Sequence, residues 1–273
     1  MNLSSQNAHP RDAHIQFQEE GHKYTITTDL SSKYTSVTTW AHSHFPHFDA
    51  DAVITSMMKG KNWNPTNKYW GLTPAQIKQQ WSQNGKEVAA AGTQLHYRIE
   101  CFMNNTVLPP RYTHQDLLNL TLEPSSQDAP EWRFFLEFVR DYPHFTPYRT
   151  EWLIYDEQVK ISGSIDMVYE NREDGTLSIY DWKRSKSIDK TNGWDKCAIT
   201  DCISHLPDSN FWHYSLQLNI YKTIIERNYG KRVSSLYLVR LHPDHLRKTY
   251  ELLKVPFLEQ EMIDLFDLKK QTI

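Results

Sequence analysis

The part of the chain that most constrains the fold lies between Tyr148 and Lys183, where the spacing of apolar residues changes from helical to alternating. Three alternating runs follow one another at 148–156, 159–170 and 176–183, with polar turns at 156–158 and 172–175. Alternation with a period of two is typical of strands that bury one face, and short polar turns join antiparallel strands. The segment therefore predicts a three-strand antiparallel meander.

Helical spacing before and after this segment predicts helices that flank the sheet. Thr73, Pro74 and Gln76 combine a side-chain cap, a proline in the first turn and a capping-box residue, which marks a helix start. This helix is expected to run to about residue 103, with kinks near Gly85 and Gly92. Further helices are expected at 130–141, at 211–228 and near the C-terminus, and further strands at 234–241 and 249–255. The order predicts a mixed α/β (α+β) fold with a central mixed sheet flanked by helices.

The N-terminal third predicts a smaller lobe in front of this core. Residues 1–13 are expected to be disordered, and the β-rich runs 23–28 and 34–39 are expected to pair as a hairpin. The division expected is an N-terminal hairpin and helical lobe at 14–91 and a core at 92–273, within one continuous structural unit at 14–273.

Composition excludes several classes of protein. A chain of 273 residues with 39% hydrophobic and 13% aromatic residues can bury a large core, so wholesale disorder is excluded. Three cysteines are too few for a disulfide framework or for the four thiolates of an iron–sulfur cluster. The chain has no apolar run of about 18 residues and no clear leader segment, so we expect an intracellular, soluble protein without a membrane partner.

Two aspartates on neighbouring strands of the meander predict a metal site. Asp166 and Asp181 are equally distant from the centre of the turn 172–175, so they are expected to lie opposite each other. Like charges opposed in this way are destabilising, and a divalent cation between them removes the conflict.

Further side chains are expected to join this pair. Lys183 lies two residues after Asp181, on the same face of the same strand, and Glu151 enters on the preceding strand as an auxiliary ligand. His96 and Glu100 are spaced i, i+4 on one helix face, and His96 is a candidate imidazole ligand. Such an oxygen-rich site suits Mg²⁺ or Mn²⁺, one ion or two, whereas zinc is disfavoured because paired thiolates are absent.

Four short segments carry a family resemblance: GTQLHYRIE at 92–100, GSID at 163–166, YDWK at 180–183 and QLNIY at 217–221. In this order they resemble the motifs of the PD-(D/E)XK nuclease superfamily. Within it the chain is most similar to the RecB-type and lambda-type exonuclease branch, and in particular to the mitochondrial genome maintenance exonucleases. With YTSVTTW at 34–40 the resemblance spans roughly residues 34–242. It implies a restriction-endonuclease-like core.

The resemblance also implies roles for single residues. It makes His96, Asp166 and Asp181 metal ligands, adds the backbone carbonyl of Trp182, and has Lys183 orient the attacking water. Asp166, Asp181 and Lys183 are thus the expected catalytic residues. Glu100, Gln217 and Tyr221 are the expected supporting residues. The implied activity is Mg²⁺- or Mn²⁺-dependent hydrolysis of DNA, most simply by an exonuclease on single-stranded DNA or DNA ends, in replication, repair or recombination.

Charge and aromatic residues after the last strand of the meander predict where the DNA strand binds. The formal net charge is −3, which argues against a broad basic face, but residues 114–182 carry 14 acidic and 5 basic side chains whereas residues 183–273 carry 15 basic and 11 acidic ones. The expected nucleic-acid contacts are Arg184, Lys186, Lys190, Trp194 and Trp212.

Other interpretations stay open. A lone aspartate on a strand is usually a surface residue paired with a lysine, His96 and Glu100 can be a solvated helix pair, and Gln217 and Tyr221 can be ordinary core residues. A cap-snatching-like or other RNA or DNA endonuclease would use residues of the same types, and a non-catalytic nucleic-acid-binding module would retain the fold alone. The polarity of digestion, the pathway and the oligomeric state are left open.

Overall fold

A six-stranded mixed sheet forms the centre of the protein in the computed structural model, which describes residues 2–104 and 129–273. Its strands are β3 (Thr35–Ser36), β4 (Thr146–Asp156), β5 (Ile161–Glu170), β6 (Leu177–Lys183), β7 (Val233–Arg240) and β8 (Glu251–Val255). The strands β4, β5 and β6 pair antiparallel in chain order, which confirms the predicted meander. β7 then lies parallel to β6 and antiparallel to β8, so the sheet is mixed as expected.

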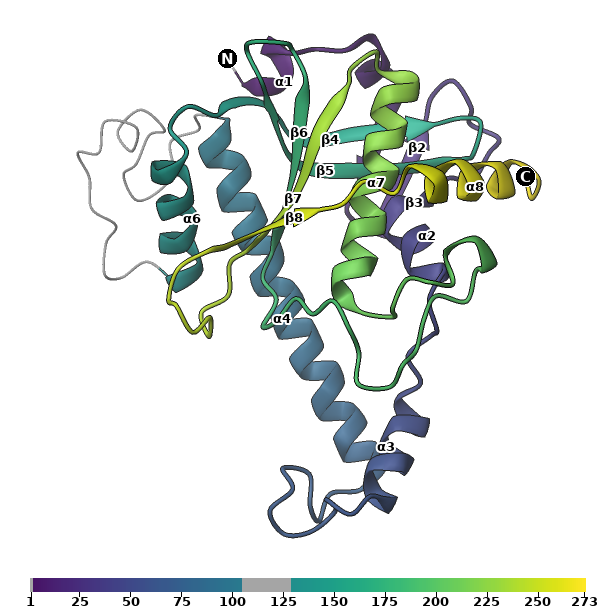
Figure 1. Cartoon of the computed structure of the whole chain (residues 1–273), viewed down its shortest axis with the longest axis vertical. Coiled ribbons are helices and arrows are strands. Elements are labelled where there is room, and N and C mark those ends of the chain that lie inside the picture. Colours follow the sequence, from purple (N-terminus) through teal and green to yellow (C-terminus); the bar gives the residue numbers. More distant parts are fainter. Residues whose placement is uncertain (1, 105–128) are drawn as a thin grey trace.

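Helices cover both faces of this sheet (Figure 1). They are α1 (Leu3–Gln6), α2 (Val37–Ser43), α3 (Ala50–Lys59), α4 (Pro74–Met103), α6 (Pro130–Asp141), α7 (Asn210–Asn228) and α8 (Glu259–Lys270). One face packs its apolar side chains against α2, α7 and α8, and the other packs against α6 and the C-terminal part of α4. The core therefore has two halves that are separated by the sheet, and residues on one strand alternate between them.

The helix α4 is longer than the sheet that it covers. Thr73 caps it with a capping box, as predicted, and the helix then continues without interruption through Gly85 and Gly92. The expected interruptions at the two glycines are therefore absent, because a glycine within a helix costs only about 1 kcal/mol. The division expected at 91/92 falls inside this one helix.

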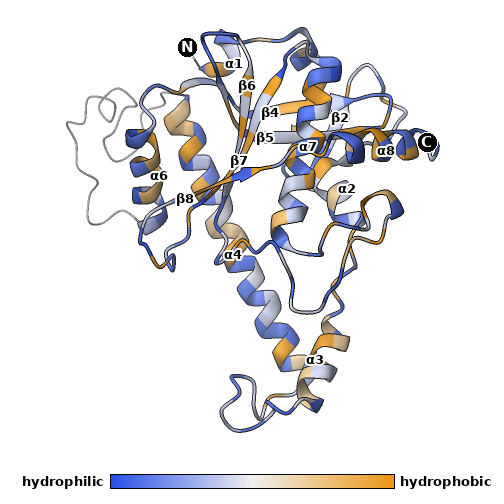
Figure 2. Cartoon of the chain, viewed as in Figure 1, coloured by the Kyte–Doolittle hydropathy of each residue, from blue (hydrophilic) through white to orange (hydrophobic). Residues whose placement is uncertain are grey.

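The N-terminal half of α4 projects away from the sheet together with α3 (Figure 1). Figure 2 shows that this half is mostly hydrophilic, with apolar residues where α3 crosses it. Ile54 of α3 and Ile77 of α4 are the buried residues at this end. Among the described residues no helix is long and apolar enough to cross a membrane.

The expectation of disorder at residues 1–13 is wrong for the described residues 2–13. Asn2 caps α1, and a short 3-10 helix follows at Pro10–His14. The Asp12 carboxylate accepts hydrogen bonds from Arg149 at 2.7 Å and from the Trp152 indole at 3.1 Å. These contacts anchor the segment to β4, and sequence patterns do not report partners that lie 140 residues away.

One strand of the predicted hairpin pairs with a different segment from the one expected. β2 (Lys23–Ile26) pairs antiparallel with β1 (Ile15–Gln18) rather than with 34–39. Ser36 instead ends β3, which lies parallel to β5, and its side chain accepts the N–H of Thr39 to cap α2. The capping serine explains why the β-branched run after it becomes helical.

Candidate metal centre and active site

The two aspartates of the meander lie where β5 and β6 separate. The ladder pairs Met167 with Tyr180 and follows the register predicted from the turn, which puts Asp166 opposite Asp181 one step further on. At this step a side chain takes the place of a backbone hydrogen bond between the strands, because the Asp166 Oδ2 atom accepts the backbone N–H of Trp182 at 2.9 Å. A carboxylate thus joins the two strands at the point where they diverge.

The edge of β5 next to Asp166 has no strand partner over a short stretch. β3 pairs with Ile161 and Ser162, and β6 pairs from Met167 onward, so residues 163–166 form an opening between the two. A Cβ atom on Gly163 would lie 2.8 Å from Cε1 of Tyr221. The glycine is therefore required because the tyrosine ring packs directly against the backbone at this residue.

The regular alternation of β5 is interrupted at Asp166. Ile165 and Val168 pack on the α7 side of the sheet, whereas Met167 packs on the α4 and α6 side. The facing residue of β4, Glu151, has a positive φ of 43°. A non-glycine residue in this region is strained, and such strain concentrates at functional sites.

His96, Glu151 and Asp166 form a cluster whose possible ligand atoms all lie within 4.8 Å of one another. The His96 Nδ1 atom is 3.5 Å from Asp166 Oδ2 and 3.9 Å from Glu151 Oε1. Its Nε2 atom is 2.9 Å from the Trp182 carbonyl, so the proton on Nε2 is donated to that oxygen. The lone pair of Nδ1 therefore faces the two carboxylates, which is the tautomer that metal ligation needs.

The electrostatics of this cluster suit a cation. Burial, together with the negative charge of Asp166, raises the pKa of Glu151 to about 7. Ser164 donates a hydrogen bond from Oγ to Glu151 Oε2 at 2.8 Å and holds the carboxylate in place. Two carboxylates and one imidazole are hard, mostly oxygen donors, so the set fits Mg²⁺ or Mn²⁺ better than a thiolate-seeking metal.

Asp181 and Lys183 form a second group beside the cluster. Asp181 is 2% exposed, and Lys183 Nζ lies 2.7 Å from its Oδ2 atom. Burial raises the pKa of Asp181 to about 6 although Lys183 opposes this shift. Burial favours the neutral amine of Lys183, but the charges of Asp181 and Asp166 outweigh it and raise the pKa of the lysine.

The helix α7 contacts Asp181 of this pair. Gln217 donates from Nε2 to Asp181 Oδ1 at 3.4 Å and is 3.3 Å from the Tyr221 hydroxyl. The Lys183 ammonium lies 4.4 Å from the ring centroid of Tyr214, a distance at which a cation is attracted to the face of an aromatic ring. Asp181 is outside the three-residue cluster in this arrangement, because its carboxylate faces Lys183.

Glu100 lies on α4 one turn after His96. Burial raises its pKa, and its charge contributes to the raised pKa of Glu151. The structure therefore brings Glu100 next to the cluster rather than onto an open surface.

The basic and aromatic residues expected to bind nucleic acid are in different surroundings. Arg184 forms an ion pair with the buried Glu131 of α6, with Nε 2.6 Å from Oε1. Lys186 is largely exposed and 3.8 Å from Asp244. Arg184 is therefore committed to a structural partner, and Lys186 is accessible.

Of the other three expected contacts, Lys190 and Trp194 lie between β6 and α7, and Trp212 lies in the first turn of α7. Trp194 is 80% exposed. Trp212 donates its indole N–H to the Lys190 carbonyl at 3.0 Å, and the Lys190 ammonium lies 4.8 Å from the ring centroid of Phe211. The Trp212 indole and the Lys190 ammonium thus make contacts within the protein, whereas the exposed Trp194 ring is free to contact a ligand.

Three residues at the site were not expected from the sequence. Ser164 and Tyr214 contact Glu151 and Lys183 as described above. Burial and the negative charge of Glu151 raise the pKa of Tyr24 to about 12, which places this residue of β2 next to the cluster. The only signal for Ser164 is its place within the motif GSID, and Tyr24 and Tyr214 have none.

The sequence also matches a known protein family. Residues 80–271 match the PD-(D/E)XK nuclease superfamily. The chain belongs to this superfamily. A search of curated proteins finds no match to the chain. The mixed sheet flanked by helices is the restriction-endonuclease-like core of this family, its activity is that of a metal-dependent nuclease, and its substrate is a nucleic acid.

Proposed function

We propose that this nuclease hydrolyses DNA phosphodiester bonds from strand ends, as a Mg²⁺- or Mn²⁺-dependent exonuclease that acts on single-stranded DNA or on DNA ends. The observation that carries the proposal is the cluster His96, Glu151 and Asp166 beside the buried pair of Asp181 and Lys183. Clustered carboxylates of this kind would repel a polyanion unless cations neutralise them.

The residues divide the work in this proposal. His96, Asp166 and Glu151 would hold a divalent ion, which would stabilise charge at the phosphate, and the Trp182 carbonyl orients His96 by accepting the Nε2 proton. Asp181 lies beside this cluster, paired with Lys183. Lys183 holds and orients the attacking water, because its ammonium stays charged beside Asp181. Gln217 and Tyr221 keep Asp181 in place from α7, and Glu100 adds negative charge near the cluster.

We place the chain in the RecB-type and lambda-type exonuclease branch, close to the mitochondrial genome maintenance exonucleases, with a role in DNA replication, repair or recombination. The support is the set of four motifs, whose residues converge on one site. The segment that follows Lys183, with the exposed residues Lys186 and Trp194, is the proposed contact for the strand.

The test is a cleavage assay on end-labelled single-stranded DNA, end-labelled duplex DNA, circular single-stranded DNA and RNA, each with Mg²⁺, Mn²⁺ or EDTA. We expect metal-dependent cleavage of linear DNA, no cleavage of circles, and loss of activity in Asp166→Asn and Asp181→Asn. Cleavage of circles or of RNA at equal rates would instead indicate an endonuclease. Strand binding without cleavage in every metal would indicate a binding module and overturn the proposal.

A further inference from the structure

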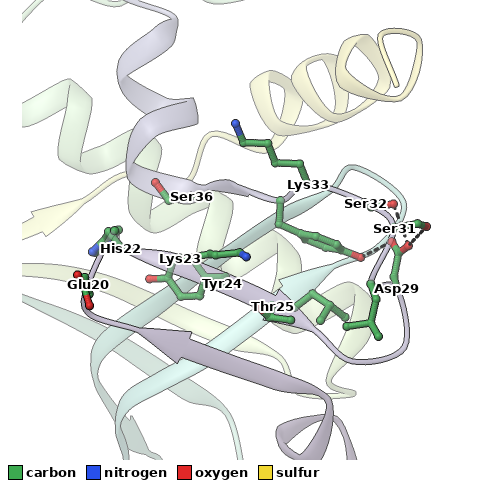
Figure 3. A pocket seen from close by; sticks show the side chains of 14 residues that line it. Glu20, His22, Lys23, Tyr24, Thr25, Asp29, Ser31, Ser32, Lys33 and Ser36 are labelled. Atoms are coloured by element: carbon green, nitrogen blue, oxygen red, sulfur yellow. Dashed lines mark hydrogen bonds between the residues drawn. The ribbon is translucent and has the colours of Figure 1, made fainter.

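A pocket with a volume of about 560 Å³ lies between β2 and the segment 29–36 (Figure 3). Small-molecule sites typically have volumes of about 300 to 1,000 Å³. The pocket is therefore large enough for one nucleotide and too small for a folded partner or several stacked bases.

One end of the pocket adjoins the metal-ligand cluster. Tyr24 and Ser36 lie together at this end in Figure 3. Ser36 pairs with Ser162 of β5, directly before the open edge that leads to Asp166. Tyr24 is near enough to Glu151 and Asp166 to feel their charges. A ligand in the pocket would thus reach the same opening that exposes the cluster.

The lining has the groups that recognise a nucleotide. Lys23 is exposed, and its ammonium lies between the two ends of the pocket in Figure 3. Ser31 and Ser32 supply hydroxyls at the end away from the cluster, and Tyr24 and Tyr34 supply aromatic rings. A cation for phosphate, aromatic faces for a base and hydroxyls for the sugar are the usual contacts to an unpaired nucleotide.

The end of the pocket away from the cluster is formed before any ligand arrives. The Asp29 carboxylate accepts hydrogen bonds from Ser32 Oγ at 2.8 Å and from the Tyr34 hydroxyl at 2.9 Å, and Lys160 forms an ion pair with it. Asp29 is therefore fully engaged as a structural residue and presents no free charge to an anion. A preformed wall lowers the entropy cost of binding.

We propose that this pocket binds the terminal nucleotide of the DNA strand, with its phosphate toward Lys23 and the metal centre. The proposal rests on the function proposed above and adds how the end of the strand is recognised. Hydrolysis adds the water oxygen to phosphorus, breaks the ester bond to the next nucleotide and returns a proton to the leaving oxygen. The product in the pocket is then a nucleoside monophosphate.

Binding is tested by calorimetric titration of the whole chain in EDTA with deoxyadenosine monophosphate and, separately, with inorganic phosphate. We expect the nucleotide to bind at least about tenfold more tightly than phosphate. Ser31→Trp, which fills the pocket from an exposed position, should remove this difference, and Lys23→Gln should weaken nucleotide binding about fivefold. Lys248→Gln, on an exposed turn elsewhere, is the matched control and should bind as the wild type does.

Equal affinity for nucleotide and phosphate in the wild type would overturn the pocket assignment, as would unchanged nucleotide binding in both variants. If Ser31→Trp fails to fold, Lys23→Gln and the wild-type comparison still decide whether the pocket binds the nucleotide.

Cleavage products supply the second readout. On end-labelled single strands the wild type should release mononucleotides, whereas Ser31→Trp should release longer products. Mononucleotide release by Ser31→Trp at the wild-type rate would contradict the pocket assignment. Absence of cleavage by the wild type on every substrate would instead contradict the proposed function, while the titration still decides whether the pocket binds a nucleotide.

Discussion

Asp166 and Asp181 have different partners although they face each other in register. Asp166 accepts the Trp182 N–H and faces the His96 Nδ1 atom at 3.5 Å. Asp181 is buried deeper and lies 2.7 Å from the Lys183 ammonium. Because burial of an uncompensated charge is costly, the ionised form of Asp181 depends on Lys183. The lysine is thus placed both to hold Asp181 ionised and to contact water.

Removal of this ammonium should affect activity far more than folding. Lys183→Met keeps the length of the side chain and lets Asp181 take up a proton, because the pKa of Asp181 is already about 6 with the lysine present. We expect the cleavage rate to fall on the order of 100-fold or more, as for other proton-handling groups. The matched control is Lys248→Met, at an exposed lysine away from the site. Wild-type cleavage by Lys183→Met would contradict the assigned role.

The close packing of Tyr221 on Gly163 makes a second prediction at a single residue. In Gly163→Ala the new methyl group would lie 2.8 Å from the ring and 3.1 Å from Val37 Cγ2, so the tyrosine must move. Overpacking of this kind costs about 1 to 3 kcal/mol. Urea unfolding of Gly163→Ala and of the control Gly193→Ala, where the added atom meets nothing within 4 Å, measures the difference. Equal stability of the two variants would show that the ring is free to shift.

At the level of elements, local patterns predicted the meander and its register because both depend on short-range spacing. The position of Asp166 opposite Asp181 follows from one turn, and the spacing of Gln217 and Tyr221 follows from one helix. The partner of β2 was missed because a strand of four residues pairs equally well, on pattern alone, with either neighbour.

The metal-ligand cluster also depends on contacts that local sequence patterns do not predict. Glu151 reaches His96 because β4 is irregular at that residue, with a positive φ of 43°, and alternation alone cannot predict this irregularity. The sequence predicted Glu151 as an auxiliary ligand on the preceding strand, but not that it lies close to His96. Tyr24 was not expected at the site, because its position depends on how β1 and β2 pack on β4.

The attachment of α2 to the segment before α7 predicts a pH dependence of stability. His44 is buried at the end of α2, its Nδ1 atom is 2.8 Å from Thr200 Oγ1, and burial lowers its pKa to about 4. A histidine that is harder to protonate in the folded state than in the unfolded state destabilises the fold as it gains a proton. Stability is therefore complete above pH 6.5 and decreases as the pH falls from 6.5 toward 4. The full loss is about 3 kcal/mol.

The measurement compares wild type with His44→Gln in urea at several pH values between 7.5 and 4. The wild type should lose about 2 to 3 kcal/mol more than the variant, because other titrating groups contribute equally to both. His47→Gln, at an exposed histidine of the same region, should follow the wild type. Parallel pH curves for wild type and His44→Gln would contradict the prediction.

Across the whole molecule, charge is divided between the metal strands and the segments after them. Residues 114–182 carry 14 acidic and 5 basic side chains, whereas residues 183–273 carry 15 basic and 11 acidic ones. The excess of positive charge begins at Lys183, at the edge of the site. A nucleic acid would therefore meet a few localised cations instead of a broad basic face, and the salt dependence of binding should be modest and attributable to single residues.

The prediction at this scale concerns the slope of log affinity against log salt for a single-stranded oligonucleotide. Each cation that contacts a phosphate contributes about 0.7 to this slope, so Lys186→Gln and Lys190→Gln should each lower it by about 0.7. Arg184→Gln should leave the slope unchanged, because its guanidinium is bound to the buried Glu131. Fluorescence anisotropy between about 50 and 200 mM salt, in an Asp181→Asn background that prevents cleavage, measures all three. A larger change for Arg184→Gln than for the lysines would mean that the arginine leaves Glu131 when the strand binds.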